Sequence, residues 1–305
     1  MTRPTTEARP IIRHRAVGPE ANEALVLATR YRLTPVRQRT PFGQYLRELV
    51  ERRHFTWELT AAQMRASNSQ ERLGSLWYVL TPILLGSVYY LVFGVLLGAG
   101  KGVPSYLGFL TCGIFLWQYT LRSITNGSRA MSSNVALVRS MHFPRAILPI
   151  SSSLRQALTV LPAIGVMLLL VLVTTGLHTA SWRWLLVLPS IALQGIFNLG
   201  LALIFARMAA NISDISVALP FVLRAWMYFS GVFYSISRFQ NHPAAYALLR
   251  ANPLHIYMTL VRDSVLYRGG LSPGIWVAAA GYAIAAATIG LLVFWQGEEQ
   301  YGRAY

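Results

Sequence analysis

Few residues outside the first 72 positions of this 305-residue chain carry acid or base chemistry. Beyond that point the acids are Asp214, Asp263, Glu298 and Glu299. An apolar segment long enough to cross a membrane separates Asp214 from Asp263, so we expect these two carboxylates on opposite sides. A general acid and a general base must reach the same substrate. We therefore predict no catalytic carboxylate pair and no enzyme activity on this chain.

Metal and nucleotide sites are not indicated either. The six histidines are scattered and Cys112 is the only cysteine, so no ligand spacing typical of a metal site occurs. A P-loop has the pattern GxxxxGK[ST], which does not occur in this sequence, and Lys101 is the only lysine. We expect no metal and no cofactor on this chain.

The arginines are numerous and unevenly distributed. Lys and Arg number 27 against 11 Asp and Glu, and 13 of the arginines precede residue 73. Five more lie in the stretch 122–155, which has no acid. Positively charged flanks of membrane helices stay in the cytoplasm. We therefore place both termini and this stretch in the cytoplasm, and the positive charge then requires no nucleic-acid partner.

Long apolar segments separate the charged residues. Hydrophobic residues make up 54% of the chain and charged residues 12%, against about 25% in soluble domains. About 20 residues of helix cross the hydrocarbon layer of a membrane. Five segments meet this length without a charge, and a sixth carries Arg224, which is tolerated where it faces protein or water. We predict an all-α integral membrane protein with six spans, at 74–97, 104–121, 156–177, 184–205, 216–236 and 273–295.

The residues before the first span divide into two parts. Residues 1–40 are basic and poor in apolar residues, which is typical of a flexible tail. Over 41–72 apolar residues such as Phe42, Leu46 and Leu49 recur at helical spacing between charged ones, which predicts an amphipathic helix in the membrane interface. No apolar leader precedes this part, so we expect the first span to direct insertion.

Two connections between spans are long enough to have structure of their own. Residues 134–140 can form a short cationic helix that ends before Pro144, because proline disfavours helical geometry at the preceding residue. On the other side, 243–249 and 254–266 are helical in pattern and are separated at Asn252-Pro253. The first connection suits docking to another protein, and the second suits a pair of short re-entrant helices.

Aromatic residues concentrate on the first and fifth spans. Trp226, Phe229 and Phe233 lie at i, i+3 and i+7, and Arg224 is on the same segment. Such spacing is more often found in core packing. The alternative, which stays open, is a row of flat surfaces along which sugar rings pass. The candidates for such a path are Tyr89, Tyr90, Phe93, Arg224, Trp226, Tyr228, Phe229, Phe233 and Tyr234.

Four motifs in order resemble one family. They are Arg65 with Leu73-Gly74-Ser75-Leu76-Trp77 and Thr81-Pro82; Phe143-Pro144-Arg145-Ala146-Ile147-Leu148-Pro149; Asp214-Ile215; and Asn252-Pro253-Leu254 followed by Arg262. Together they resemble the transmembrane subunit of type-2 ABC exporters that move O-antigen, teichoic acid and related lipid-linked polysaccharides. Ser230-Gly231 departs from the Ser-Pro that is frequent in this family. The Arg-rich composition is similar to that of actinobacterial members, whose cargo could be cell-wall galactan.

The resemblance implies partners and roles. The chain would form a homodimer in the cytoplasmic membrane, surrounded by membrane lipid, and two copies of a separate ATPase would bind ATP and Mg²⁺ beneath it. The helix over 41–72 would act as a gate, and 73–305 would be the transmembrane domain. Coupling to the ATPase would involve Asn134, Leu137, Arg139, His142, Phe143, Pro144 and Arg145. An exit cap would include Asn252, Pro253 and Arg262.

Two other functions share parts of this pattern. A type-2 ABC permease that exports a drug or a lipid would have the same fold. A membrane-embedded enzyme of glycan or lipid assembly would act without an ATPase, but it would need the acidic residues that this chain lacks on one side.

Overall fold

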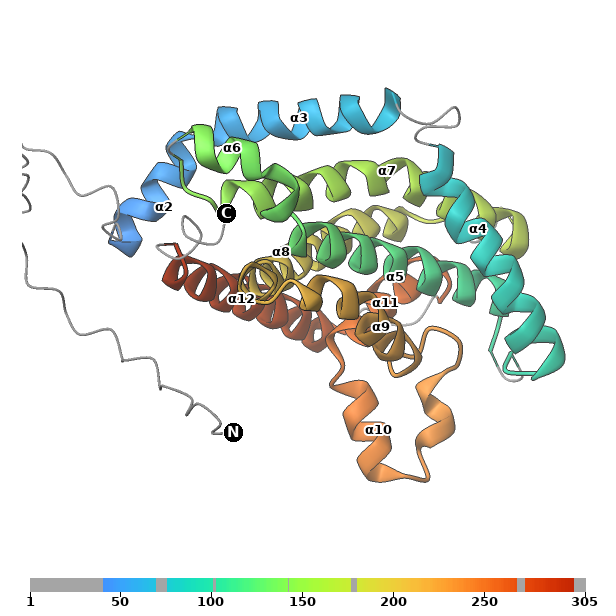
Figure 1. Cartoon of the computed structure of the whole chain (residues 1–305). Coiled ribbons are helices and arrows are strands. Elements are labelled where there is room, and N and C mark those ends of the chain that lie inside the picture. The colour runs from blue at the N-terminus through green and yellow to red at the C-terminus, as the bar shows by residue number, and fades with distance from the viewer. Residues whose placement is uncertain are drawn as a thin grey trace, which may run out of the picture. The chain divides into compact units, whose positions relative to one another are not determined.

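The computed structural model describes residues 41–69, 76–100, 103–141, 143–176, 180–267 and 272–298. These residues are helical and contain no strand (Figure 1), which confirms the all-α fold class. The predicted tail over 1–40 lies outside the described residues, as do His142 and the motif residues 73–75. The description below concerns the unit formed by residues 41–305.

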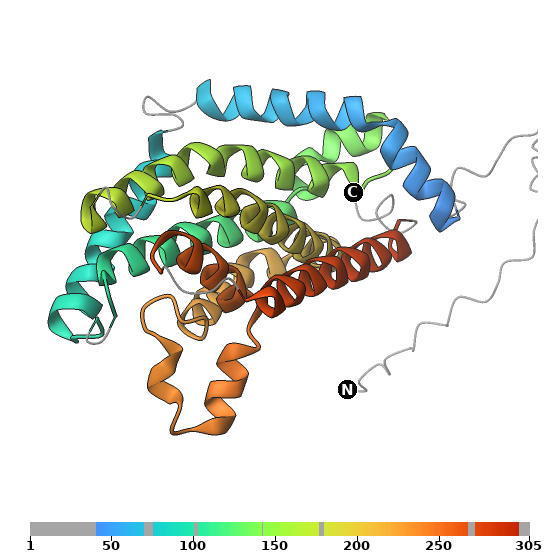
Figure 2. The ribbon, with the colours of Figure 1, turned by 180° about the vertical axis from the view of Figure 1, so that it is seen from behind.

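The segment 41–72 contains two helices where the sequence predicts one. α2 (Phe42–Glu51) and α3 (Arg53–Ser69) meet at Arg52, whose φ of −88° and ψ of 18° leave the helical range. α3 lies along α7 (Ile147–Thr175) in both views (Figures 1 and 2), and the Thr60 hydroxyl donates to the Ser151 carbonyl at 3.4 Å. One face of α3 is therefore covered by protein.

Helices cover the segments that the sequence assigns to the membrane. They are α4 (Trp77–Tyr89) with a π-helical continuation (Tyr90–Leu96), α5 (Tyr106–Ser128), α7, α8 (Val187–Asn211), α9 (Asp214–Tyr228) and α12 (Pro273–Gln296). Among the described residues, Val79–Leu96, Ile147–Thr175, Trp182–Asn211 and Pro273–Gln296 are long and apolar enough to cross a membrane. α5 and α9 are not in this group. α9 has only 15 residues.

α5 packs against both α7 and α8, which also contact each other. Its side chains Leu110, Cys112 and Ile124 are fully buried. Polar groups on it are satisfied by neighbours: the Gln194 amide on α8 donates to the Leu116 carbonyl and to the Thr120 hydroxyl, both at 2.9 Å. A helix surrounded by protein can carry such groups, because other helices replace the missing water.

Small residues allow α8 and α12 to pack closely. A Cβ atom at Gly200 of α8 would collide with the backbone of Ala286 on α12, and one at Gly290 would collide with the Gly200 carbonyl. Helices in membranes gain most from such close backbone approach, because lipid offers no hydrophobic driving force for their association.

The fifth predicted span is shorter than expected. We predicted helix to residue 236, but α9 ends at Tyr228, and Gly231 follows with a φ of +67°, in the left-handed region that favours glycine. The chain then forms a short 3₁₀ turn (Ile236–Phe239), α10 (Pro243–Arg250) and α11 (Pro253–Val265). The two short helices predicted between the fifth and sixth spans are therefore present, and α11 packs on α5, α8 and α12.

Candidate functional site

The predicted coupling segment, residues 134–145, contains the short helix α6 (Val135–Ser140) and lies where α5 and α8 end and α7 begins. We call this region the α6 end of the unit. Asn134 precedes α6, and its side-chain amide donates to the Ala130 carbonyl at 2.8 Å. Leu137 and Phe143 are half-buried against an apolar cluster, and the Phe143 ring lies 5.4 Å from the Phe55 ring of α3. The segment is therefore packed onto α3.

The exposed part of this segment is small and cationic. Arg139 and the apolar side chain of Met141 are exposed, whereas Pro144 is buried. Of the predicted coupling residues, the structure thus leaves Arg139 outermost and places Phe143, Pro144 and Arg145 toward the interior. A partner at this end would contact α6, and the inward residues would carry its movement to the helices behind.

Glu298, directly after α12, connects three parts of the chain at the α6 end. Its carboxylate accepts a hydrogen bond from the Tyr45 hydroxyl of α2 at 3.0 Å and from the Arg145 backbone N–H at 2.9 Å. The Arg145 guanidinium donates to the Glu298 carbonyl at 2.6 Å, and the Tyr45 hydroxyl accepts from the Ala146 N–H at 3.3 Å. α2, the coupling segment and the end of α12 are thus joined through one carboxylate.

The environment of Glu298 changes its acidity. Burial raises the pKa of its carboxyl above the ordinary value, although the Arg145 N–H and guanidinium and the Tyr45 hydroxyl favour the ionised form. The contacts with Arg145 and Tyr45 thus oppose the effect of burial on this pKa without cancelling it.

Four of the predicted path aromatics form one cluster between α4 and the end of α9. The Phe233 ring is stacked on Phe93 at 4.4 Å and lies 4.7 Å from Tyr89 and 5.5 Å from Tyr228. Phe233 is fully buried. The i, i+3, i+7 face that we predicted for this residue is wrong, because α9 ends before it. In this structure the Phe233 ring packs in the core, and its place in a cargo path stays a prediction.

The remaining path candidates differ in exposure. Trp226 is half-buried and its indole N–H donates to Asn252 at 3.3 Å, while the Tyr234 hydroxyl donates to the Tyr228 carbonyl at 2.8 Å. Arg224, Tyr228 and Phe229 are exposed on α9 and at its end, with 64% of Phe229 accessible. Tyr90 is also exposed, at the start of the π-helical segment.

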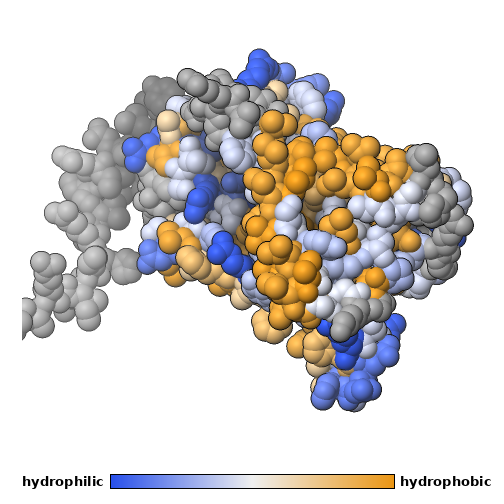
Figure 3. All heavy atoms as spheres, turned by 90° about the vertical axis from the view of Figure 1, so that its right-hand side faces the viewer, coloured by the Kyte–Doolittle hydropathy of each residue, from blue (hydrophilic) through white to orange (hydrophobic). Residues whose placement is uncertain are grey.

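Exposed apolar side chains cover α4 as well as α9. Leu84, Val88 and Val95 are each more than half accessible. Figure 3, which faces the side where α4 lies in Figure 1, shows a broad patch of hydrophobic residues. Such a surface requires lipid or another protein chain to cover it.

The predicted exit cap contains structural contacts. Asn252 caps α11 by accepting from the Leu254 N–H at 3.0 Å, and its amide donates to the Phe229 carbonyl at 3.0 Å and the Ser230 hydroxyl at 3.1 Å. Pro253 is the first residue of α11. This capping contact fixes the start of α11 to the end of α9.

Arg262 does not face outward as an exit-cap residue would. Its side chain is 2% exposed and lies over the Phe109 ring at 3.4 Å. The guanidinium donates to the carbonyls of Phe109, Gly231 and Val232 at 3.1–3.3 Å. The backbone carbonyls after the end of α9 are acceptors that a buried guanidinium can satisfy, so Arg262 holds this turn in place, and its role in an exit cap stays a prediction.

Sequence reasoning missed three residues at these sites. Tyr45 shares the apolar face of α2 with Phe42 and Leu49, and its hydroxyl on that face was an available signal. Glu298 and Glu299 are adjacent acids just after an apolar span in a chain with few acids, which was a second signal. Gly113 gives no signal in the sequence. A Cβ atom at this position would lie 2.7 Å from the Arg262 guanidinium, so the need for glycine arises only from the packing of α5 on α11.

Comparison with known proteins agrees with this architecture. Residues 55–266, more than half of the chain, match the family model described as ABC-2 type transporter. The chain is 25% identical over 177 residues to an O-antigen export system permease protein RfbA of Klebsiella pneumoniae, covering 58% of this chain and 67% of that protein. It is 26% identical over 217 residues to one of Myxococcus xanthus, covering 70% and 81%. The chain therefore belongs to the ABC-2 type transporter family, as a multi-pass membrane permease of a type-2 ABC exporter.

Proposed function

We propose that this chain is the membrane-spanning subunit of an ATP-driven exporter that moves a lipid-linked polysaccharide across the cytoplasmic membrane. Two copies of the chain form the translocation unit, and two copies of a separate ATPase supply the energy. The observation that carries this proposal is the match to the ABC-2 family together with relatives named as O-antigen export permeases. The cargo is a glycan of the O-antigen, teichoic acid or galactan type.

The α6 end is the surface where the ATPase docks, and it faces the cytoplasm. Arg139 is exposed on α6, and Phe143 and Arg145 connect this segment to α3 and to Glu298. A displacement of α6 is therefore passed to α2, α3 and α12 through contacts that already exist. This geometry supports a permease whose helices are moved by a partner at that end.

The cargo passes beside α4 and α9, where two copies of the chain face one another. The exposed aromatic side chains Tyr90, Tyr228 and Phe229 lie on these two elements, and Arg224 is exposed on α9. Flat aromatic surfaces suit sugar rings, and an arginine at membrane depth suits a wet path better than lipid.

Reconstitution tests the proposal. The chain and its partner P-loop ATPase are reconstituted in vesicles with the ATPase on the outside. A fluorescent lipid-linked polysaccharide is added to the outer leaflet, and the appearance of its glycan in the vesicle lumen is measured. We expect movement that requires ATP, and none with an ATPase whose P-loop lysine is replaced. Transport of small amphiphiles but not of the glycan would contradict the proposed cargo, and ATP-independent turnover of the glycan by the chain alone would contradict the proposed transport function.

A further inference from the structure

A polar cavity of about 410 Å³ lies at the α6 end, between α3, the end of α5 and the start of α7. Its lining includes the side chains of Gln63, Asn126, Arg129, Ser152 and Arg155. Cavities of roughly 300–1,000 Å³ are typical of sites for small ligands. The cavity does not coincide with any of the predicted path residues.

Hydrogen-bond donors dominate this cavity. Two guanidinium groups and three side-chain amides line it, and no acidic residue is part of the lining among the residues that the structure describes. The Nε of Arg155 is buried and has no hydrogen-bond partner among the described residues. Arg129 uses one N–H on the Ser216 carbonyl at 3.2 Å and keeps its other donors. A buried donor without a partner costs free energy unless a ligand or water satisfies it.

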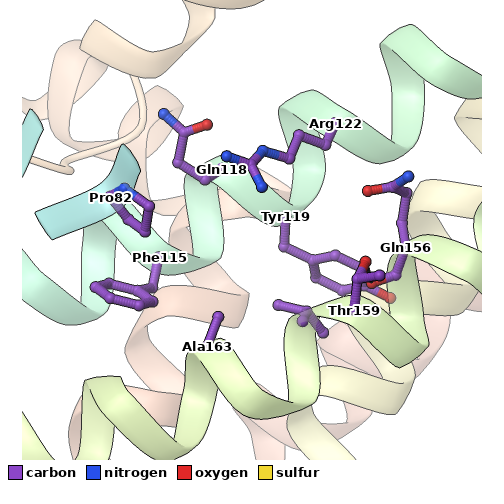
Figure 4. A pocket seen from close by; sticks show the side chains of 9 residues that line it. Pro82, Phe115, Gln118, Tyr119, Arg122, Gln156, Thr159 and Ala163 are labelled. Atoms are coloured by element: carbon purple, nitrogen blue, oxygen red, sulfur yellow. Dashed lines mark hydrogen bonds between the residues drawn. The ribbon is translucent and has the colours of Figure 1, made fainter. Parts of the chain in front are cut away.

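A second, smaller cavity adjoins α4, α5 and α7. Its volume is about 20 Å³, and its lining mixes polar side chains such as Gln118, Arg122 and Gln156 with apolar ones such as Phe115 and Ala163 (Figure 4). On α5, Arg122, Asn126 and Arg129 lie at i, i+4 and i+7, so they share one face. On α7, Arg155 and Gln156 are consecutive and line the larger and the smaller cavity, respectively.

The donor set selects for an anion with several oxygens. Guanidinium groups bind phosphate oxygens in a bidentate manner, and they retain their charge at membrane depth because arginine does not lose its proton. Among the described residues, no carboxylate in the lining competes for these donors. A neutral sugar would not use two positive charges.

We propose that this cavity binds the phosphate-bearing headgroup of a lipid on the α6 side, and that Arg129 and Arg155 are its ligands. The proposal rests on the proposed function, because a lipid-linked polysaccharide carries such a headgroup between its glycan and its tail. α3 forms one wall through Gln63, so a bound headgroup contacts the helix that also packs on the coupling segment. The same chemistry would accept the headgroup of an anionic bilayer lipid.

Binding to the full chain in nanodiscs of neutral phosphatidylcholine tests the site. The probes are a radiolabelled polyprenyl diphosphate and, separately, labelled phosphatidylglycerol. We expect the diphosphate to bind and the Arg155→Gln and Arg129→Gln variants to weaken binding at least tenfold, with partial recovery in Arg155→Lys. Arg250→Gln is the matched control, since Arg250 is exposed on α10.

The outcomes separate the sources and the alternatives. If both variants bind the polyprenyl diphosphate more weakly than wild type does, the cavity is a site for the cargo headgroup. If they bind only phosphatidylglycerol more weakly, the same residues form a site for a bilayer lipid. Equal binding by wild type, both variants and the double variant overturns the proposal. Glycan export at the wild-type rate by the double variant would exclude the cargo headgroup as the ligand while the proposed function stands, whereas a wild-type complex that exports no glycan removes the proposed function itself.

Discussion

At the scale of single residues, Arg262 shows how a buried charge can hold a membrane fold together. Its guanidinium binds the carbonyls of Gly231 and Val232, which α9 leaves without helical partners when it ends at Tyr228. No acidic side chain provides one of its hydrogen bonds. Arginine suits this position because its planar fork reaches several acceptors at once.

Replacing this arginine should therefore affect folding more than transport. Arg262→Met leaves two buried carbonyls without a donor, at a cost of about 2–6 kcal/mol in unfolding free energy. We expect a lower melting temperature and less folded protein in detergent, with export falling in proportion to the folded amount. Arg250→Met, on the exposed face of α10, is the control. Normal stability with lost export would show instead that Arg262 acts on the cargo.

Glu298 predicts a pH dependence of stability. Burial raises the pKa of its carboxyl in the folded protein, so the folded state holds this proton more tightly than the unfolded state does. Its contribution to stability is then complete below its ordinary pKa and is lost as pH rises through the raised value. Glu298→Gln cannot ionise. We expect the melting temperature of wild type relative to this variant to fall as pH increases from 4.5 to 7.5, and a constant difference would contradict the shift.

At the scale of elements, the surroundings of each glycine predict whether a larger side chain at that position disturbs the packing of two helices. Gly200 faces the backbone of Ala286, whereas Gly165 of α7 has open space where a Cβ would stand. Valine at either position has a similar intrinsic effect on a helix. We expect Gly200→Val to separate α8 from α12 and lower the unfolding free energy by about 3 kcal/mol or more, since backbone cannot move aside as a side chain can.

Thermal unfolding of the two variants in detergent checks this comparison. Gly165→Val should melt within a few degrees of wild type, because it faces outward. Equal destabilisation by both substitutions would mean that helix propensity and not helix packing decides the effect.

A substitution in the coupling segment should lower the efficiency of transport without preventing assembly of the permease with its ATPase. Phe143→Ala removes the ring that contacts Phe55 of α3, so α6 can still meet the ATPase but its motion reaches α3 less completely. We expect the amount of glycan exported per ATP hydrolysed to fall several-fold in the reconstituted complex. Met141→Ala, two residues earlier and exposed, should leave that ratio unchanged. An unchanged ratio in Phe143→Ala would contradict the transmission role.

At the scale of the whole molecule, α4 and α9 carry apolar side chains that no other part of the described chain covers. Exposed apolar and aromatic side chains on α4 and α9 include Val88, Val217 and Phe221, and they need lipid or a second copy to cover them. Two copies that meet on these helices would place the exposed aromatic residues of both beside one path.

This arrangement predicts different effects for two groups of aromatics. Tyr228→Ala with Phe229→Ala changes exposed rings, and we expect slower glycan passage with near-normal stability. Phe233→Ala changes a fully buried ring and should lower the unfolding free energy by about 3–5 kcal/mol. Export rates and melting temperatures measured on the same preparations separate the two. Unchanged export in the double variant would remove these residues from the path.

Much of the helical layout followed from the sequence because length and polarity are local properties. The charge-free segments predicted the helices, and Asn252-Pro253 correctly marked the start of α11. The break after Tyr228 was not predicted: apolar residues continue past it, and only the left-handed φ of Gly231 reveals it. The same break changes Phe233 from a helical-face residue into a core residue.

The sequence by itself determined the environment in which this protein folds, because its long apolar segments and few charges indicate a membrane protein. The tertiary structure alone decided which polar groups meet. Arg262 and Arg155 are both arginines near apolar segments, yet the guanidinium of Arg262 donates to carbonyls, whereas Arg155 lines a cavity and its buried Nε has no hydrogen-bond partner among the described residues. That difference depends on contacts between helices far apart in the chain, because the cost of a buried polar group is set by its partners and not by its type.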